Sequence, residues 1–413
     1  MDFIADLHIH SHYSLATSKQ LVIPQLELWG KKKGITVIGT GDAAHPGWLA
    51  EIKKDLRSCG NGLFTVKKGV SLQEKKRYDG ESVYFILTAE ISSIYRYDGR
   101  VRKVHNIVLA PSFASFEKIQ KKLSTIGNIT SDGRPILGLD SRDLLEIVLE
   151  ADSEAVLIPA HIWTPWFSVL GSKSGFDSIE ECYRDLSSNI FAVETGLSSD
   201  PPMNRRCSFL DKYTLVSNSD AHSPEKLGRE ANLFSTDCSY EGIMTALKDP
   251  DKGFKGTIEY FPEEGKYHLD GHRSCTIRWE PEDTIKHNGI CPVCGKPVTV
   301  GVLNRVNELA DRKERSKKNC TVPFLSLTGL KSIIAEWLNV REQSKKVSRQ
   351  YDELLLKFGS EFTILIDVPV EDLVKYDPVL AEGIDNLRKG MVRLEGGYDG
   401  VFGSVNVFNK EGA

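Results

Sequence analysis

Seven short apolar segments rich in β-branched residues recur within the first 222 residues, and helix-like stretches separate most of them. Such segments predict buried strands, which we place at 3–10, 35–42, 83–92, 104–110, 155–161, 191–196 and 214–220. Helices are predicted at 24–33, 116–123, 141–151 and 179–185. This succession predicts an α/β fold, either a barrel or a doubly wound sheet.

Side chains that can bind metal lie near the C-terminal ends of most of these predicted strands. They are His8, His10, Asp42, His45, Glu90, His161, Glu194, Asp220 and His222. The pattern favours the barrel, because its strand ends meet on one rim where catalytic groups collect. His105 starts its strand and reaches that rim only if 104–110 pairs antiparallel with 83–92. We expect that pairing, through a loop at 94–103.

The spacing of these residues indicates metal ligands. His8 and His10 are two residues apart, so on a strand they share a face. Neutral imidazole and carboxylate groups suit zinc and similar ions. Any one histidine at a strand end is as often a plain polar residue, but the set is harder to dismiss. Nine residues could hold two or three divalent ions, with zinc expected and magnesium or manganese as alternatives: His8, His10, Asp42, His45, Glu90, His105, His161, Asp220 and His222.

A second metal site is predicted after residue 258. Cys275, Cys291 and Cys294 lie close together, and the Cys-x2-Cys pair is followed by a glycine. This spacing is typical of a structural tetrahedral zinc. His272 is the preferred fourth ligand, with His268 and His287 as alternatives. A pair of reduced surface thiols is the other interpretation.

Composition divides the rest of the chain. Residues 301–350 carry eleven Lys and Arg against five Asp and Glu, although the whole chain has a net charge of −4. Clustered cations suit a phosphate backbone, while any single lysine fits a solvated helix face equally well. We predict three units: a catalytic barrel at 1–258, a zinc-binding module at 259–303 and a mainly helical DNA-binding domain at 304–413.

The location is predicted from features at the start of the chain and from the cysteines. The first residues contain neither a basic region nor an apolar signal core, and no apolar run is long enough to cross a bilayer. Eight cysteines without a disulfide pattern fit a reducing compartment. We therefore expect a cytoplasmic protein with no membrane partner.

The ordered motifs resemble the PHP family of phosphoesterases. They are DLHIH at 6–10, GTGDAAHP at 39–46, TAEIS at 88–92, His105, PAH at 159–161 and SDAH at 219–222. The resemblance implies a distorted (β/α)7 barrel and metal-dependent phosphoester hydrolysis. The catalytic residues would be His8, His10, Glu90, Asp220 and His222. Two alanines separate Asp42 from His45, unlike the common family form, so whether Asp42 binds metal directly or supports a ligand stays open.

Three further segments extend the resemblance to the endonuclease Q family: GKYHLDGHRSC at 265–275, NGICPVCGKPVTVGVLNRVNELADR at 288–312 and EGGYDGVFGSVNVF at 395–408. This resemblance implies a DNA-repair endonuclease acting on damaged double- or single-stranded DNA. It would cut 5′ of a deaminated base (uracil, hypoxanthine or xanthine) or an abasic site, leaving a 3′-hydroxyl and a 5′-phosphate. We expect a monomer. A sliding clamp is a conceivable partner, but the C-terminus has no clear clamp-binding motif.

Four aromatic residues are candidates for contact with a flipped base. Trp163 and Trp166 closely follow His161, and Tyr398 and Phe402 lie in the glycine-rich segment near the C-terminus. We hypothesise that they wedge or stack the damaged nucleotide. Ordinary aromatic packing under a loop is the competing interpretation.

Two other functions remain open. A PHP phosphatase or exonuclease acting on a small phosphoester or a DNA end would not need residues 259–413. A non-enzymatic DNA-binding accessory protein would be expected to have lost metal ligands, and none of the nine positions is missing.

Overall fold

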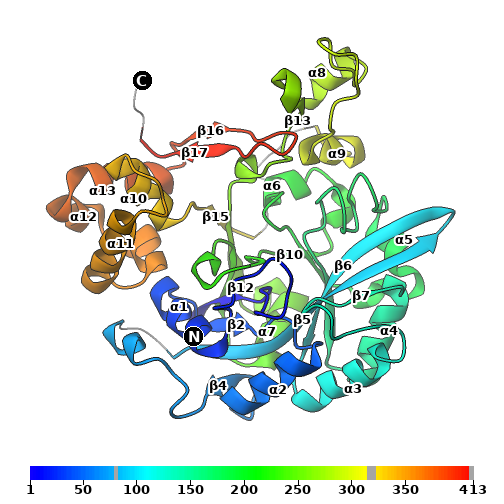
Figure 1. The fold of residues 1–413 in the computed structure, drawn as a ribbon, viewed down its shortest axis with the longest axis horizontal. Helices are drawn as coiled ribbons and strands as arrows, with labels where there is room; N and C mark the ends of the chain where they lie inside the picture. Colours follow the sequence, from blue (N-terminus) through cyan, green and yellow to red (C-terminus); the bar gives the residue numbers. More distant parts are fainter. Residues whose placement is uncertain (79–81, 314–321, 409–413) are drawn as a thin grey trace.

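The computed structural model describes residues 1–78, 82–313 and 322–408, which form a mixed α/β fold (Figure 1). All seven predicted strands are present. They are β1 (Asp2–Asp6), β2 (Val37–Gly39), β5 (Tyr84–Tyr97), β6 (Arg100–Ala110), β8 (Val156–Pro159), β9 (Ala192–Glu194) and β10 (Thr214–Val216). Five of them end two to four residues before the predicted end, so their candidate ligands lie on or beyond the strand ends.

Most strands belong to one sheet with the order β15-β12-β11-β1-β2-β5-β4-β3, to which β6, β7 and β8 are added through β5 and β6. The remaining members are β3 (Leu56–Ser58), β4 (Phe64–Val66), β7 (Ile136–Leu137), β11 (Ala231–Ser235), β12 (Phe254–Glu259) and β15 (Phe324–Ser326). β9 and β10 form a separate parallel pair. The Ile162 amide donates to the Glu194 carbonyl, and Ile9 bridges Ala221. These links set the pair between β8 and β1.

β5 and β6 pair antiparallel, as predicted, but the loop expected at 94–103 is wrong. The strands continue to Tyr97 and resume at Arg100, so only Asp98 and Gly99 turn. Both have positive φ, 49° and 72°, the conformation of a tight type I′ hairpin that Asp-Gly favours. The register pairs Ser92 with His105, which returns His105 to the rim that carries Glu90.

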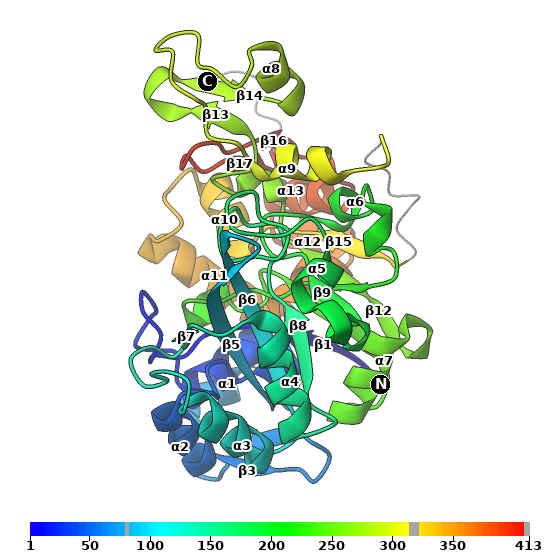
Figure 2. The same cartoon turned by 90° about the vertical axis from the view of Figure 1, so that its right-hand side faces the viewer.

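Helices cover the outside of the sheet in both views (Figures 1 and 2). The four predicted ones are confirmed as α1 (Ile23–Lys33), α3 (Phe113–Leu123), α4 (Ser141–Ala151) and α5 (Ile179–Tyr183), the last passing into a 3-10 turn at Arg184–Asn189. α2 (Pro46–Asp55), α6 (Pro201–Asn204) and α7 (Tyr240–Lys248) were not predicted. Amphipathic spacing buries one side of each longer helix; in α4, Leu144, Leu145 and Val148 are almost fully buried.

A small module follows the sheet and projects at the top of Figure 2. It contains β13 (Asp270–His272), β14 (Ile277–Trp279), α8 (Pro281–Lys286) and α9 (Val302–Leu309). The C-terminal part comprises α10 (Leu330–Leu338), α11 (Lys345–Phe358), α12 (Val370–Tyr376), α13 (Pro378–Arg388) and the hairpin β16 (Arg393–Glu395) with β17 (Ser404–Asn406). β15 pairs parallel with β12, so residues 304–413 also supply a strand to the main sheet.

The basic stretch of the tail is only partly visible. Arg312 and Lys313 are described, while Arg315, Lys317 and Lys318 lie outside the described residues. None of the helices in the described parts of the chain is long and apolar enough to span a bilayer.

Candidate metal centre

Six of the nine predicted ligands converge into two neighbouring groups. His8, His10 and Asp220 form one group, and Glu90, His105 and His161 form the other. Within each group, one potential ligand atom from each residue lies within 4.8 Å of the others. The residues come from distant strand ends, so the fold brings together what the sequence only suggested.

Glu90 connects the two groups. Its Oε1 lies 2.5 Å from His105 Nδ1 and 3.1 Å from His161 Nε2, whereas Oε2 lies 3.5 Å from His10 Nε2. Burial would raise the pKa of this carboxyl, but the charge of His105 and the hydrogen bonds to His105 and His161 hold that pKa well below its ordinary value. An ionised carboxylate between the two groups could offer a ligand oxygen to a cation held by either of them.

His8 presents an unsatisfied nitrogen to the centre. Its Nδ1 lies 3.1 Å from each carboxylate oxygen of Glu194, and the Asn218 amide also donates to Glu194 at 2.9 Å. The buried Nε2 has no hydrogen-bond partner and lies 3.8 Å from Glu90 and 3.9 Å from Asp220. A lone imidazole nitrogen facing two carboxylates is costly without a cation, so the donor set fits a metal ion.

Asp42 supports His10 and does not join either group. Its Oδ1 lies 3.1 Å from His10 Nδ1, and its Oδ2 accepts hydrogen bonds from the Ser11 amide and hydroxyl and from the Ser14 hydroxyl. These bonds, with His10, keep the pKa of Asp42 below its ordinary value although burial opposes this. The far nitrogen of His10 meets Asp220 Oδ1 at 2.9 Å. Asp42 therefore orients the ring of His10 toward the centre.

His45 and His222 also stand outside the two groups. His45 caps α2, because its Nδ1 accepts from the Trp48 amide at 3.3 Å, and its Nε2 donates to the Thr130 carbonyl at 3.1 Å. Both of its ring nitrogens are thus engaged. The His222 ring lies 4.7 Å from that of His10, and its Nδ1 donates to the Asp220 carbonyl. That leaves His222 Nε2 available at the edge of the centre.

Three residues at the centre have left-handed backbone conformations. The φ angles are 50° at Asp42, 28° at His161 and 46° at Asp220. For residues other than glycine such conformations cost about 1–3 kcal/mol each and cluster at functional sites. The surrounding packing therefore holds these side chains in place against local strain.

Two residues that the ligand prediction left out belong to the centre. Glu194 ends a buried strand, and the charge-burial argument used for Glu90 would also have found it. Arg134 donates from Nη1 to Glu90 Oε2 at 3.1 Å. It sits in a loop, where strand periodicity gives no signal.

The aromatic candidates lie in different surroundings. Trp163 is fully buried and donates its indole N–H to Asn204 Oδ1 at 2.8 Å, as the packing interpretation predicts. Trp166 is 43% exposed. Tyr398 is partly buried and lies against Gly271 of β13, where an added Cβ would meet its ring at 2.5 Å.

The predicted ligands of the second metal site also lie close together. One potential ligand atom from each of His272, Cys275, Cys291 and Cys294 lies within 4.8 Å of the other three. His287 instead stacks on Trp279 at 4.6 Å. Three thiols and one imidazole are the donor set of a closed structural zinc.

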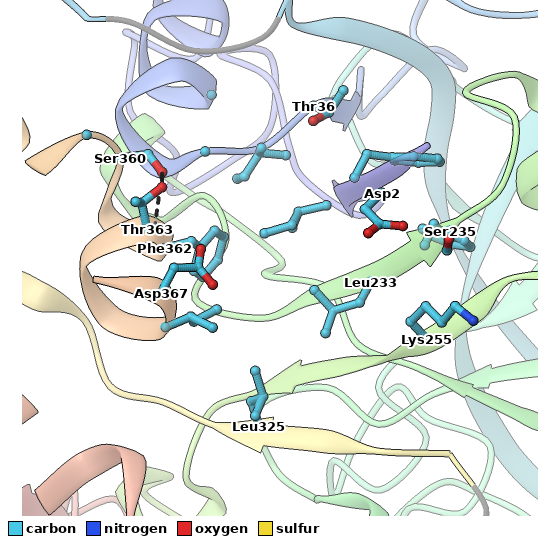
Figure 3. A pocket seen from close by; sticks show the side chains of 18 of the residues that line it. Asp2, Thr36, Leu233, Ser235, Lys255, Leu325, Ser360, Phe362, Thr363 and Asp367 are labelled. Carbon is cyan, nitrogen blue, oxygen red and sulfur yellow. Dashed lines mark hydrogen bonds between the residues drawn. The ribbon is translucent and has the colours of Figure 1, made fainter. Parts of the chain in front are cut away.

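Figure 3 shows a cavity of about 810 Å³. It is lined by the start of β1, by β11 and by the short π-helix Thr363–Asp367, with Leu233, Leu325 and Phe362 among its apolar residues. None of the predicted ligands lines it. The chemistry is therefore concentrated at the opposite, C-terminal ends of the strands.

The fold and its two histidine–carboxylate groups define a metal-dependent hydrolytic enzyme. Two solved structures match nearly the whole chain, each at 32% identity over 99% of it. One is the lesion-specific endonuclease PfuEndoQ from Pyrococcus furiosus, with a TM-score of 0.85 over 96% of that chain. The other is endonuclease Q in complex with a 27-mer duplex carrying an abasic lesion, with a TM-score of 0.84 over 98% of that chain. The chain belongs to the endonuclease Q family.

Sequence relatives match different shares of the chain. Residues 329–391 match the family model described as the MJ0043 C-terminal domain. The protein MJ0043 of Methanocaldococcus jannaschii is 34% identical over 267 residues, which cover 62% of this chain but only 33% of MJ0043. YqxK of Bacillus subtilis is 27% identical over 425 residues, covering 97% of this chain and 98% of YqxK.

Proposed function

We propose that this protein is an endonuclease that hydrolyses DNA 5′ of a deaminated base or an abasic site, leaving a 3′-hydroxyl and a 5′-phosphate. The observation that carries the proposal is the position of Glu90, whose carboxylate contacts imidazoles of two neighbouring ligand groups. A relative that aligns with 99% of the chain was solved with an abasic duplex at its active site. The shared fold and the paired ligand groups support a common substrate class.

Two or three divalent ions, zinc foremost and magnesium or manganese as alternatives, would activate a water molecule and neutralise phosphate charge when held by these residues. His8, His10, Glu90, His105, His161 and Asp220 would hold them, with His222 as a further candidate at the edge. Glu194 and Asp42 fix which nitrogen His8 and His10 present to the centre. Such supporting contacts set ligand orientation and basicity.

Arg134 is placed to bind the scissile phosphate. Its side chain is 23% exposed, and its Nη1 lies 3.1 Å from Glu90 Oε2. The loop that carries it is fixed: the Gly133 amide donates to the Tyr13 carbonyl, and the amides of Leu15 and Arg134 donate to Asp132. A rigid cation with donors left over can stabilise the charge that develops on phosphate oxygens.

The remaining parts have structural and binding roles in this proposal. The seven strands β1, β2, β5, β6, β8, β9 and β10 act as a distorted (β/α)7 barrel within residues 1–258. One zinc held by the cysteine cluster would stiffen the module at 259–303, which is too small to form a hydrophobic core of its own. Residues 304–413 contact DNA through their basic side chains. Lesion discrimination requires the damaged nucleotide to leave the stack.

The test is an incision assay on labelled duplexes that carry uracil, hypoxanthine, an abasic site or no lesion. Cutting of damaged strands alone, with ends mapped as 3′-hydroxyl and 5′-phosphate, is expected. A His10→Ala variant should be inactive on all four duplexes, which excludes a contaminating nuclease. Release of phosphate from a small monoester without cutting of any duplex would instead favour the phosphatase alternative.

A further inference from the structure

Four side chains from three distant segments form a line on the surface, here called the aromatic–lysine strip: Trp166, Tyr267, Lys266 and Phe402. The Trp166 and Tyr267 rings meet edge to face with centroids 6.0 Å apart. The Lys266 ammonium lies 5.7 Å from the Tyr267 ring and 5.7 Å from the Phe402 ring. The strip therefore combines three aromatic rings with one cation, which lies between Tyr267 and Phe402.

Phe402 is solvent-facing although its backbone is fixed. Its side chain is 73% exposed. Asp399 and Gly400 have φ of 43° and 86°, and Tyr398 and Val401 exchange both backbone hydrogen bonds around them. This is a tight two-residue hairpin turn. The turn is tied to the zinc-binding module because the Gly400 amide donates to the Lys266 carbonyl, and Asp399 accepts from the Arg273 amide at 2.7 Å.

Trp166 belongs to the loop that carries His161. The Thr164 hydroxyl donates to the Trp166 carbonyl at 2.9 Å and lies 3.2 Å from His161 Nδ1. Phe167 has φ of 62°, a strained conformation for a bulky residue, and its ring lies 4.8 Å from His105. The loop thus turns Phe167 inward onto a candidate ligand and leaves Trp166 outward. One end of the strip is thereby coupled to the metal centre.

We propose that the aromatic–lysine strip binds nucleotides of the damaged strand that have lost their stacking neighbours beside the cut. This inference rests on the proposed function and names the surface that would receive the DNA. Unstacked bases would lie on the faces of Trp166 and Phe402, and Lys266 would contact a phosphate of the same strand. Proteins that hold unpaired nucleic acid without reading its sequence combine aromatic rings, on which bases stack, with cations that contact the backbone. A DNA strand carries negative phosphates and aromatic bases, so it complements both the lysine and the aromatic rings of the strip.

The test compares Trp166→Ala and Phe402→Ala with Leu356→Ala, a matched loss of a side chain that is 50% exposed on α11. The probe is a duplex with an abasic site, a fluorescent 2-aminopurine beside it and a phosphorothioate that blocks cutting. Each aromatic variant should weaken binding about 5- to 100-fold and lose part of the fluorescence quenching, because base–aromatic stacking has this size. Leu356→Ala should bind as wild type does, and all variants should melt normally.

Two variants of Lys266 provide a second test of the strip. Lys266→Glu should weaken binding of the same probe and flatten its salt dependence, while Lys266→Arg should restore both. Wild-type binding and quenching in both aromatic variants would overturn the strip, even if the wild-type enzyme cuts damaged DNA. Failure of the wild-type protein to bind or cut any damaged duplex would overturn the proposed function, and the strip with it.

Discussion

Nδ1 of His8 lies 3.1 Å from both carboxylate oxygens of Glu194, so this ring donates its proton toward β9 and turns Nε2 to the metal centre. Burial alone would lower the pKa of His8, but the charge of Glu194 and the hydrogen bond to it raise that pKa well above its ordinary value. The Glu194 carboxylate thus sets the tautomer of His8 and raises its pKa, and it does so from the side of the ring that faces away from the metal centre.

Glu194→Gln is expected to weaken metal binding and incision about 10- to 100-fold, because the neutral amide neither charges nor fixes the His8 ring as strongly. Metal content after dialysis and incision rate would be measured on the same samples. Glu241→Gln, at an exposed position of α7, is the matched control. Full metal retention together with a full incision rate in Glu194→Gln would contradict the role assigned to Glu194.

Arg134→Ala is expected to slow incision about 100-fold or more while the metal content stays close to wild type, because the guanidinium is assigned to the phosphate and not to the ions. Arg134→Lys should recover only part of the rate, since a lysine lacks the planar fork. Single-turnover rates and metal analysis would be compared with Arg96→Ala on the β5–β6 hairpin. Loss of metal that tracks the loss of rate would assign Arg134 to holding Glu90 instead.

Much of the fold followed from periodicity, and the failures have physical reasons. Local sequence indicates both the short buried strands and the Asp-Gly turn between β5 and β6. The expectation of a longer loop at 94–103 did not use the turn-forming tendency of Asp-Gly. The burial of Trp163 could not be predicted, because the exposure of a loop residue depends on which distant segments cover it. Here Asn204 of α6 accepts a hydrogen bond from the indole N–H.

The supporting residues of the centre were harder to find than its ligands. Ligand candidates could be recognised by residue type and strand position, whereas Arg134 acts from a loop that only tertiary contacts fix. Whether Asp42 is a ligand or a support was left open by the sequence. Its three hydrogen bonds from Ser11 and Ser14 place it behind His10.

Cys291→Ser is expected to remove one zinc per chain and to loosen residues 259–303, because this buried thiol is one of four ligands that replace a core. Zinc analysis and limited proteolysis would report the two effects. The barrel ions should remain, so the metal content should fall by this one zinc only. Cys59→Ser, at an exposed cysteine, should change neither reading. An unchanged zinc count in Cys291→Ser would contradict the site.

Glu259 makes stability depend on pH. Its buried side chain on β12 accepts hydrogen bonds from Thr195 and Ser217, which adjoin Glu194 and Asn218 behind His8. Burial raises the pKa of this carboxyl from 4.5 to about 8. The folded protein therefore keeps a proton that the unfolded chain releases. The resulting contribution to stability is complete below about pH 4.5 and is lost progressively as the pH rises to about 8.

Glu259→Gln imitates the protonated form and should remove this part of the pH dependence. The variant and the wild type should unfold at similar urea concentrations near about pH 4.5, and the variant should become the more resistant of the two toward about pH 8. Urea midpoints across this range would be compared, with Glu241→Gln as control. A difference in urea midpoint that is the same at every pH would contradict this prediction. It would mean that Glu259 is already ionised in the folded protein and that the Thr195 and Ser217 hydroxyls donate to a buried charge.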